Sequence, residues 1–261
     1  LDRISTEEAP FFMVQSYYPP HEPYTTEKRY MDRYRGKGIF RPGYYAAVTA
    51  LDDCVGRILE ALERNDLTRD TLVIYTSDHG EHFNYRAKLN KTTGHDDSIR
   101  IPMMMSWPGR IDAGRRFDEP VGLQDITPTL LDLAGAEAPD LSHGESLLPS
   151  VFGQGRVQRT QYYVQNVEDF RTIDDWYALT NGKVYLPSSR NYRSETGEWD
   201  RQRALWTPEL KLVLSEEGRH LLYDLRVDPE EELNLFGAPK FDYYNQYQHI
   251  PDPTPTCRQL T

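Results

Sequence analysis

At 261 residues, with 38% hydrophobic and 12% aromatic residues, the sequence is long enough for one large domain with a smaller appendage and too aromatic for a disordered chain. Its formal net charge of -11 argues against broad electrostatic binding to nucleic acid or to an anionic membrane. No apolar stretch reaches the length of a membrane span. Nucleic acid and a membrane span are therefore not expected.

The predicted elements of the first 150 residues alternate between strands and helices. Residues 10–16 form a short apolar run that predicts a buried strand, and residues 71–76 and 101–106 predict two more. Residues 44–64 predict an amphipathic helix, because apolar residues recur there at steps of four and three: Tyr44, Val48, Leu51, Val55, Ile58 and Leu62. A further helix is predicted from Thr127 and Pro128, and Gly135 can close it.

This order of elements predicts an α/β fold, with a mostly parallel central sheet flanked by helices over residues 1–150. After residue 150 the pattern changes. Short strand-like runs at 161–164, 211–214 and 221–223 alternate with glycine, proline and charged residues. They predict a smaller antiparallel sheet within residues 151–261, followed by an extended tail.

Three features could carry chemistry. Asp78 and His79 directly follow the predicted strand 71–76, at the strand end where open sheets collect ligands, and a carboxylate beside an imidazole can reach one metal ion. The loop 86–91 carries three cations, Arg86, Lys88 and Lys91, in an otherwise acidic chain. His21 lies in a proline-rich loop. Taken alone, each is better explained by a plain structural role: a strand-end cap, a solvated loop and a loop histidine.

Five segments in order resemble landmarks of the formylglycine-dependent sulfatase family, in the alkaline phosphatase superfamily. Residues 71–81 are similar to its strand and metal-binding turn, and residues 91–102 to its lysine motif, with Arg-x-Pro at the end. Residues 20–23, Pro-His-Glu-Pro, resemble the segment that bears a sulfate-contacting histidine. Residues 125–135 and 222–234 resemble its later helix and its C-terminal signature.

The resemblance implies a hydrolase that cleaves a sulfate ester. It also implies a sulfated carbohydrate as the substrate, because such substrates are common in the family. Asp78 and His79 would be ligands of a divalent metal, which is calcium in most sulfatases. Lys91 would contact the sulfate and the bridging oxygen, and His21 would contact the sulfate or protonate the leaving alcohol. His95, which replaces the usual aromatic residue of the lysine motif, either touches substrate or fills a packing position. A secreted or periplasmic location is implied as well.

Two departures keep other readings open. The Cys/Ser-x-Pro-x-Arg motif that is converted to formylglycine is absent, so the nucleophile is expected on an N-terminal segment or a companion chain of the same enzyme, and this chain alone should be inactive. An imidazole at position 79 suits manganese or zinc better than calcium. A phosphonate monoester or phosphodiester hydrolase of the same superfamily, or a non-catalytic sulfatase-like binding module, therefore remains an alternative.

Overall fold

The structure is a computed structural model that describes residues 9–83, 91, 93–137, 143–155, 157, 159, 162–166, 202–215 and 220–236. Contacts between residues divide these into two compact units. The first holds the described residues of 1–73 and 106–113, and the second holds those of 74–105 and 114–248. The predicted division near residue 150 stays a prediction.

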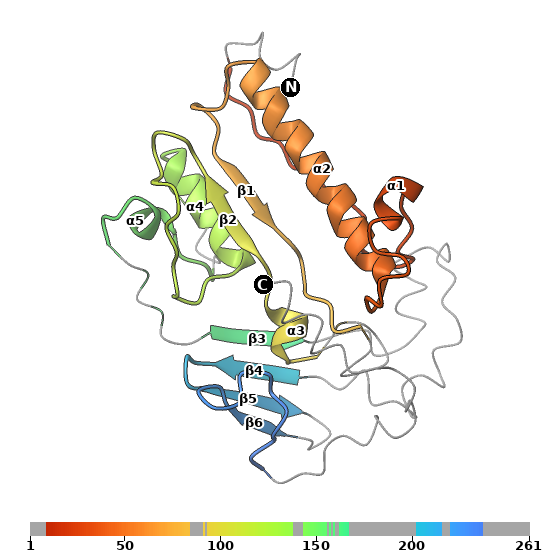
Figure 1. Ribbon diagram of the computed structural model, residues 1–261. Helices are drawn as coiled ribbons and strands as arrows, with labels where there is room; N and C mark the ends of the chain where they lie inside the picture. The colour runs from red at the N-terminus through yellow and green to blue at the C-terminus, as the bar shows by residue number, and fades with distance from the viewer. Residues whose placement is uncertain are drawn as a thin grey trace, which may run out of the picture. The chain divides into compact units, whose positions relative to one another are not determined.

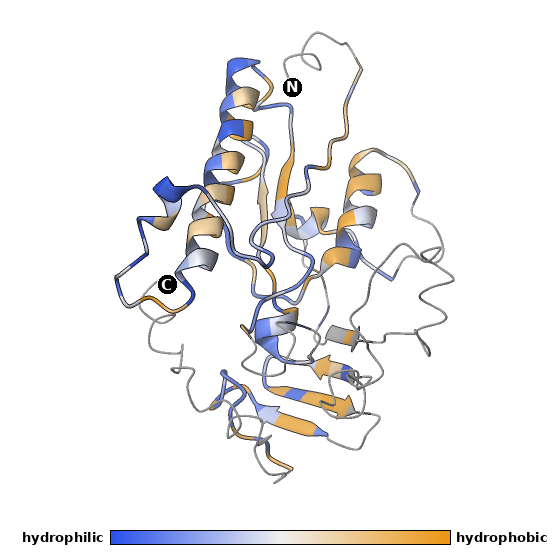
Figure 2. Cartoon of the chain, turned by 90° about the vertical axis from the view of Figure 1, so that its right-hand side faces the viewer, coloured by the Kyte–Doolittle hydropathy of each residue, from blue (hydrophilic) through white to orange (hydrophobic). Residues whose placement is uncertain are grey.

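The first unit is built on a long amphipathic helix. Helix α2, Pro42–Arg64, confirms the predicted helix and begins slightly earlier, because proline suits a first turn whose N–H groups need no partner in the helix. Helix α1, Lys28–Met31, and the turn after it pack against α2. The hydroxyl of Tyr30 in α1 lies 2.8 Å from Asp53 Oδ2, and that of Tyr34 in the turn lies 2.6 Å from Thr49 Oγ1. Figure 2 shows hydrophilic and hydrophobic residues mixed along α2. No helix in the described residues is both long and apolar enough to cross a bilayer.

The predicted strand at residues 10–16 was wrong. This segment has no regular secondary structure, and Phe12 and Val14 are 75% and 72% exposed. An apolar run becomes a strand only when another strand satisfies its backbone N–H and C=O groups, and none pairs with it among the described residues. The apolar composition therefore misled on both burial and strand formation, because composition alone does not supply a pairing partner.

The strands predicted at 71–76 and 101–106 are confirmed as β1, Val73–Thr76, and β2, Met103–Ser106, which pair with each other (Figure 1). Thr76, the last residue of β1, donates to the carbonyl of Pro102, directly before β2, at 2.9 Å. The end of β1 thus lies beside the start of β2, as in an antiparallel pair. Helix α3, Asp96–Ile99, lies between the two strands in the sequence.

Helix α4, Ile126–Leu133, follows a 3-10 turn, Leu123–Asp125. The predicted capping residue is corrected: Asp125 rather than Thr127 precedes the helix, whereas Gly135 closes it as predicted, with a φ of +68°. Asp125 is fully buried and binds Arg159 through both oxygens, at 2.8 and 3.0 Å. Burial alone raises the pKa of Asp125, but the bonds from Arg159 and from the backbone N–H groups of Glu145 and Gly122 outweigh it and hold the pKa below its usual value. Helix α5, Leu148–Val151, follows.

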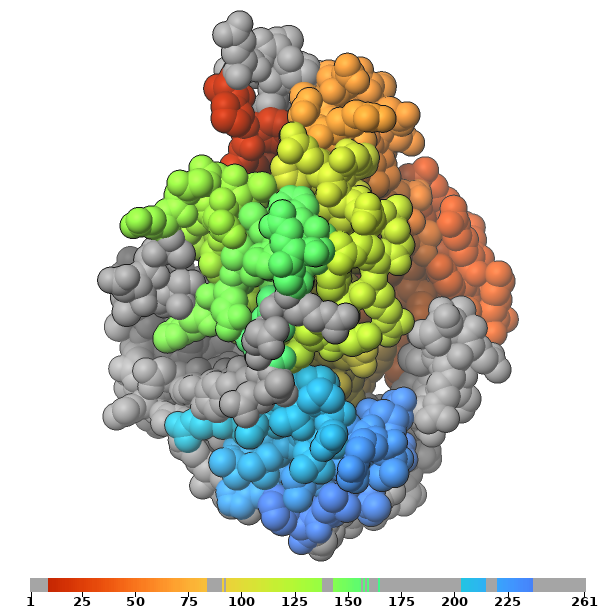
Figure 3. All heavy atoms as spheres, turned by 90° about the vertical axis from the view of Figure 1, so that its left-hand side faces the viewer, coloured from red at the N-terminus to blue at the C-terminus, as the bar shows by residue number. Residues whose placement is uncertain are grey.

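The C-terminal part of the second unit is a four-stranded antiparallel sheet in the order β3-β4-β5-β6 (Figure 1). The atoms of the described residues of 202–236, cyan to blue in Figure 3, lie together on the face shown there. Its strands are β3, Tyr162–Asn166; β4, Gln202–Trp206; β5, Leu210–Ser215; and β6, Leu221–Asp224. The predicted antiparallel sheet is confirmed, although the sequence analysis missed β4. The predicted tail, from residue 242, lies outside the described residues.

The fold class is therefore confirmed in its coarser form. The chain is a mixed α/β protein whose C-terminal sheet is small and antiparallel. The predicted mostly parallel central sheet is not seen in the described residues, where the strands make a pair and a four-stranded antiparallel sheet. Alternation of strands and helices in the sequence favours a parallel sheet, but the contact of Thr76 with Pro102 shows that β2 runs back along β1 instead.

Candidate active site

The turn after β1 carries the first two candidate residues. Ser77 Oγ donates to the carbonyl of His79 at 2.7 Å, and the His79 N–H donates to Asp78 Oδ1 at 3.1 Å. The Gly80 N–H then donates to the carbonyl of Ser98 at 2.7 Å. These bonds hold the turn in shape and attach it to α3, which ends the lysine motif.

The same turn meets Lys91. Lys91 Nζ lies 3.0 Å from His79 Nε2, and His79 Nδ1 lies 2.7 Å from the carbonyl of Gly80. A lysine ammonium only donates hydrogen bonds, so Nε2 must accept here and Nδ1 must carry the proton that it donates to Gly80. Asp78 Oδ2 lies 3.6 Å from the same Nε2 atom. Three of the five predicted site residues, Asp78, His79 and Lys91, are thus together.

This arrangement fits part of a metal site. A histidine that ligates a metal commonly donates its other ring N–H to a backbone carbonyl, and His79 already does so towards Gly80. The Asp78 side chain is 84% exposed and available to a ligand, whereas the single Nε2 lone pair of His79 accepts from the Lys91 ammonium and would bind a metal only after Lys91 has moved off it. No group of three or more metal-ligating side chains lies within the described residues, so Asp78 and His79 would need ligands from elsewhere.

Gly80 is required by close packing. A Cβ built on it would lie 2.2 Å from the carbonyl oxygen of Asp97, which is impossible without moving backbone. We expect Gly80→Ala to push the turn away from residues 97–98, to destabilise the protein by about 1–3 kcal/mol and to reduce activity. The control is Gly56→Ala in α2, where nothing lies within 4 Å and a gain of up to about 1 kcal/mol is expected. Equal melting temperatures for the two variants, by calorimetry, would contradict this account of the turn.

His95 contacts the C-terminal sheet. Its Nε2 atom lies 3.1 Å from the hydroxyl of Tyr223 on β6, and the two rings are 5.9 Å apart between centroids. This contact is of the packing kind that the sequence left open as one alternative. A substrate role for His95 stays a prediction.

A buried triad of Lys211, Asp96 and Glu231 lies next to this contact and was missed by the sequence analysis. Lys211 Nζ is 2.6 Å from Asp96 Oδ1 and 2.6 Å from Glu231 Oε1. Glu231 Oε2 in turn accepts the Asp96 N–H at 2.9 Å. One signal was available: Lys211 interrupts an otherwise apolar strand, in Leu-Lys-Leu-Val-Leu from Leu210 to Leu214.

The triad makes stability depend on pH. Burial, the largest cause, raises the pKa of Glu231 to about 7, with Lys211 opposing the shift and the charge of Asp96 adding to it. The folded state therefore keeps a proton that the unfolded chain releases near the ordinary value of 4.5. The contribution of protonated Glu231 to the free energy of unfolding is complete below pH 4.5, and it is lost as the pH rises towards 7.

We accordingly expect the melting temperature of the protein to fall between about pH 5 and about pH 8. In Glu231→Gln, which has no titrating carboxyl at this position, the part of that fall due to Glu231 should be absent. Glu232→Gln, a change at an exposed neighbour, is the control and should keep the wild-type slope. Calorimetry across this pH range measures both variants. Parallel curves for Glu231→Gln and the wild type would show that Glu231 does not titrate there.

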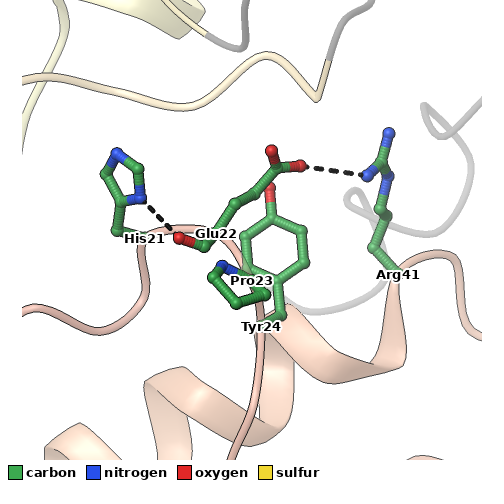
Figure 4. Close-up of a pocket in the computed structure, with 5 residues that line it drawn as sticks. All are labelled: His21, Glu22, Pro23, Tyr24 and Arg41. Atoms are coloured by element: carbon green, nitrogen blue, oxygen red, sulfur yellow. Dashed lines mark hydrogen bonds and ion pairs between the residues drawn. The ribbon is translucent and has the colours of Figure 1, made fainter. Parts of the chain in front are cut away.

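His21 belongs to the first unit. It lines an open cavity of about 570 Å³ together with Glu22, Pro23, Tyr24 and Arg41 (Figure 4). His21 Nδ1 lies 2.8 Å from the carbonyl of Glu22, and Arg41 Nη1 lies 3.5 Å from Glu22 Oε1. The cavity thus combines an imidazole, a guanidinium and the Glu22 carboxylate that pairs with the guanidinium. Arg86 and Lys88, from the predicted cation cluster, lie outside the described residues.

Comparison with known proteins identifies the family. The sequence profile of the sulfatase family matches residues 1–136. The chain belongs to the sulfatase family. It is 28% identical to the ulvan-active sulfatase of Formosa agariphila over 93% of this chain and 47% of that protein. It is 26% identical to an arylsulfatase of Clostridium perfringens, over 89% of this chain and 50% of that protein. The chain spans about half the length of these curated relatives.

Solved structures give the same fold. The protein named yidJ from Bacteroides fragilis superimposes with a TM-score of 0.70 at 24% identity, covering 99% of this chain and 54% of the other. BT4656, solved with its substrate D-glucosamine-2-N,6-O-disulfate, gives 0.57 at 24% identity, covering 84% of this chain and 40% of the other. The phosphonate monoester hydrolase of Agrobacterium radiobacter gives 0.60 at 25% identity, with the same coverages of 84% and 40%.

Proposed function

We propose that the complete protein containing this sulfatase-family chain hydrolyses a sulfate ester, with Lys91, His79 and Asp78 in its active site. The observation that carries the proposal is the meeting of these residues: Lys91 Nζ and Asp78 Oδ2 lie 3.0 and 3.6 Å from the same His79 nitrogen. A lysine, an imidazole and a carboxylate at one strand end can hold an oxyanion and a cation together.

Each residue has a proposed part in the reaction. Asp78 and His79 would hold a divalent cation, calcium in this proposal, which would supply positive charge to a bound sulfate. Lys91 contacts the sulfate and the bridging oxygen, where its fixed charge stabilises the negative charge that develops as the ester bond breaks. His21 contacts the sulfate or gives a proton to the leaving alcohol. The nucleophile is proposed to be a formylglycine encoded outside residues 1–261, on an N-terminal segment or a companion chain.

A sulfated carbohydrate is the proposed substrate class. The relative from Formosa agariphila is named an ulvan-active sulfatase, and BT4656 was solved with a disulfated glucosamine. The His21 cavity also has polar side chains and an aromatic ring, Tyr24, of the kinds that bind sugars, although its Arg41 is paired with Glu22. We also propose that the complete protein is secreted or periplasmic and that its central sheet is mostly parallel.

The second candidate is a phosphonate monoester or phosphodiester hydrolase. Two observations favour it: the fold likeness to the Agrobacterium radiobacter enzyme, and an imidazole ligand at position 79, which suits manganese or zinc. A non-catalytic binding module is less favoured, because Lys91, His79 and Asp78 meet in a geometry that binding alone does not need.

Peptide mass spectrometry of the complete protein, purified from cells able to make formylglycine, separates an enzyme from a binding module. The proposal predicts a peptide in which a Cys or Ser of a Cys/Ser-x-Pro-x-Arg motif carries an aldehyde. Complete sequence coverage with no such motif and no companion chain would overturn the catalytic reading.

A further inference from the structure

The buried triad places a lysine where the sheet pattern calls for an apolar residue. On β5 the buried side chains are those of Lys211 and Val213, whereas Leu210 and Leu214 are about half exposed. Lys211 is 0% exposed and Glu231 is 1% exposed at the side chain. Burying charges costs free energy even when they are paired, and apolar residues of similar size are often as stable. A role beyond stability is therefore worth seeking.

The triad joins three distant segments of the chain. Lys211 comes from β5, Glu231 from the segment after β6, and Asp96 is the first residue of α3. Directly before Asp96, His95 makes its own contact with Tyr223 on β6, at 3.1 Å. Two consecutive residues of the lysine motif thus contact the C-terminal sheet. Asp96 pairs with the ammonium of Lys211, and the His95 ring contacts the hydroxyl of Tyr223.

The attachment leads on to Lys91. The Thr93 N–H lies 3.4 Å from Ser98 Oγ, and the Ser98 and Ile99 N–H groups both donate to the His95 carbonyl at 3.0 Å. Residues 93–99 are therefore folded on themselves, and the Gly80 N–H ties them to the metal-binding turn at Ser98. Lys91 is only four residues before His95, so the position of its backbone depends on where the start of α3 lies.

We propose that the C-terminal sheet positions the catalytic lysine: Lys211 and Tyr223 act as positioning residues that hold His95 and Asp96, and through them Lys91 against His79. This inference rests on the proposed function for its effect on catalysis, but the placement of Lys91 is a physical claim that can be read separately. The C-terminal sheet then forms part of the active-site scaffold.

The decisive variant is Tyr223→Phe in the complete protein, with Tyr30→Phe as its matched control. Both tyrosines are almost fully buried, at 4% and 3% exposure, and each loses one hydroxyl bond, to His95 or to Asp53. Both variants should lose a similar amount of thermal stability. Because misplacing a catalytic group by about 1 Å can cost about 100-fold, we expect kcat to fall about tenfold in Tyr223→Phe with KM little changed. Tyr30→Phe should keep the wild-type kcat.

Lys211→Met is the stronger variant, with an expected loss of kcat of about 100-fold. It leaves buried Glu231 and part-buried Asp96 without their ammonium and can prevent folding, so Tyr223→Phe decides the question. A kcat for Tyr223→Phe equal to that of Tyr30→Phe would overturn the proposal.

A second readout separates this inference from the proposed function. Competitive acetylation of lysine side chains, quantified by mass spectrometry, measures the reactivity of Lys91 without any substrate. Loss of its position against His79 should change the Lys91 acetylation rate severalfold in Tyr223→Phe and leave it unchanged in Tyr30→Phe. If the wild type cleaves no sulfate ester, the proposed function fails, yet a changed Lys91 rate would still support positioning. An unchanged rate would reject it.

Discussion

Replacing Lys91 with alanine in the complete protein is expected to lower kcat for a sulfate ester by about 100- to 1,000-fold, as the loss of one preorganised charge partner of a transition state does. The expectation follows from the position of Lys91 Nζ, 3.0 Å from His79 Nε2, beside the proposed metal ligands. The negative charge grows on the bridging oxygen only as the bond breaks, so the loss should fall on kcat more than on KM. Steady-state kinetics measures it.

Lys37→Ala is the control for this prediction, because Lys37 is exposed and its removal changes the net charge by the same amount. It should leave both kcat and KM at wild-type values. Near-normal turnover by Lys91→Ala would remove Lys91 from the reaction and, with it, the reason to regard this corner of the second unit as an active site.

Replacing Asp78 with alanine is expected to abolish retention of the divalent cation. Removing a supporting group around a metal typically weakens binding 10- to 100-fold, so loss of a carboxylate ligand should cost about 100-fold or more. Without Asp78, the only remaining proposed ligand in this chain is His79, whose Nε2 lone pair accepts from Lys91. Elemental analysis of the dialysed complete protein gives the metal content per chain, independently of activity.

Asp112→Ala, at an exposed carboxylate, is the control and should retain the wild-type metal content. Unaltered metal in Asp78→Ala would reject Asp78 as a ligand. The identity of the metal in the wild type adds a second result: calcium agrees with the sulfatase proposal, whereas manganese or zinc favours the phosphonate or phosphodiester alternative.

Sequence reasoning predicted the elements whose signals are local. The periodic apolar residues of α2 specify one face of a helix, and the β-branched run of β1 specifies a strand, whatever surrounds them. Asp78 and His79 could be placed at a strand end for the same reason. The proximity of Lys91 to His79 rested on resemblance to a family, because no local pattern brings two residues together across a loop.

The rest depends on contacts between distant parts of the chain. The segment 10–16 has the composition of a strand, yet pairing partners are not encoded in composition. The triad joins positions 96, 211 and 231, and only the folded chain shows that Lys211 points inward between two carboxylates. Likewise, strand propensity predicts that β1 and β2 are strands, but it does not predict that they pair in antiparallel directions.

The central claim, that the complete protein is a sulfuric ester hydrolase, is tested most directly by offering it three esters side by side: an aryl sulfate, a phosphodiester and a phosphonate monoester with the same leaving group. A sulfated sugar should be included, with release of inorganic sulfate as the readout. We predict that kcat/KM is highest for a sulfate ester and that this activity is lost in Lys91→Ala. A higher kcat/KM for the phosphodiester or the phosphonate, with little sulfate released, would contradict it.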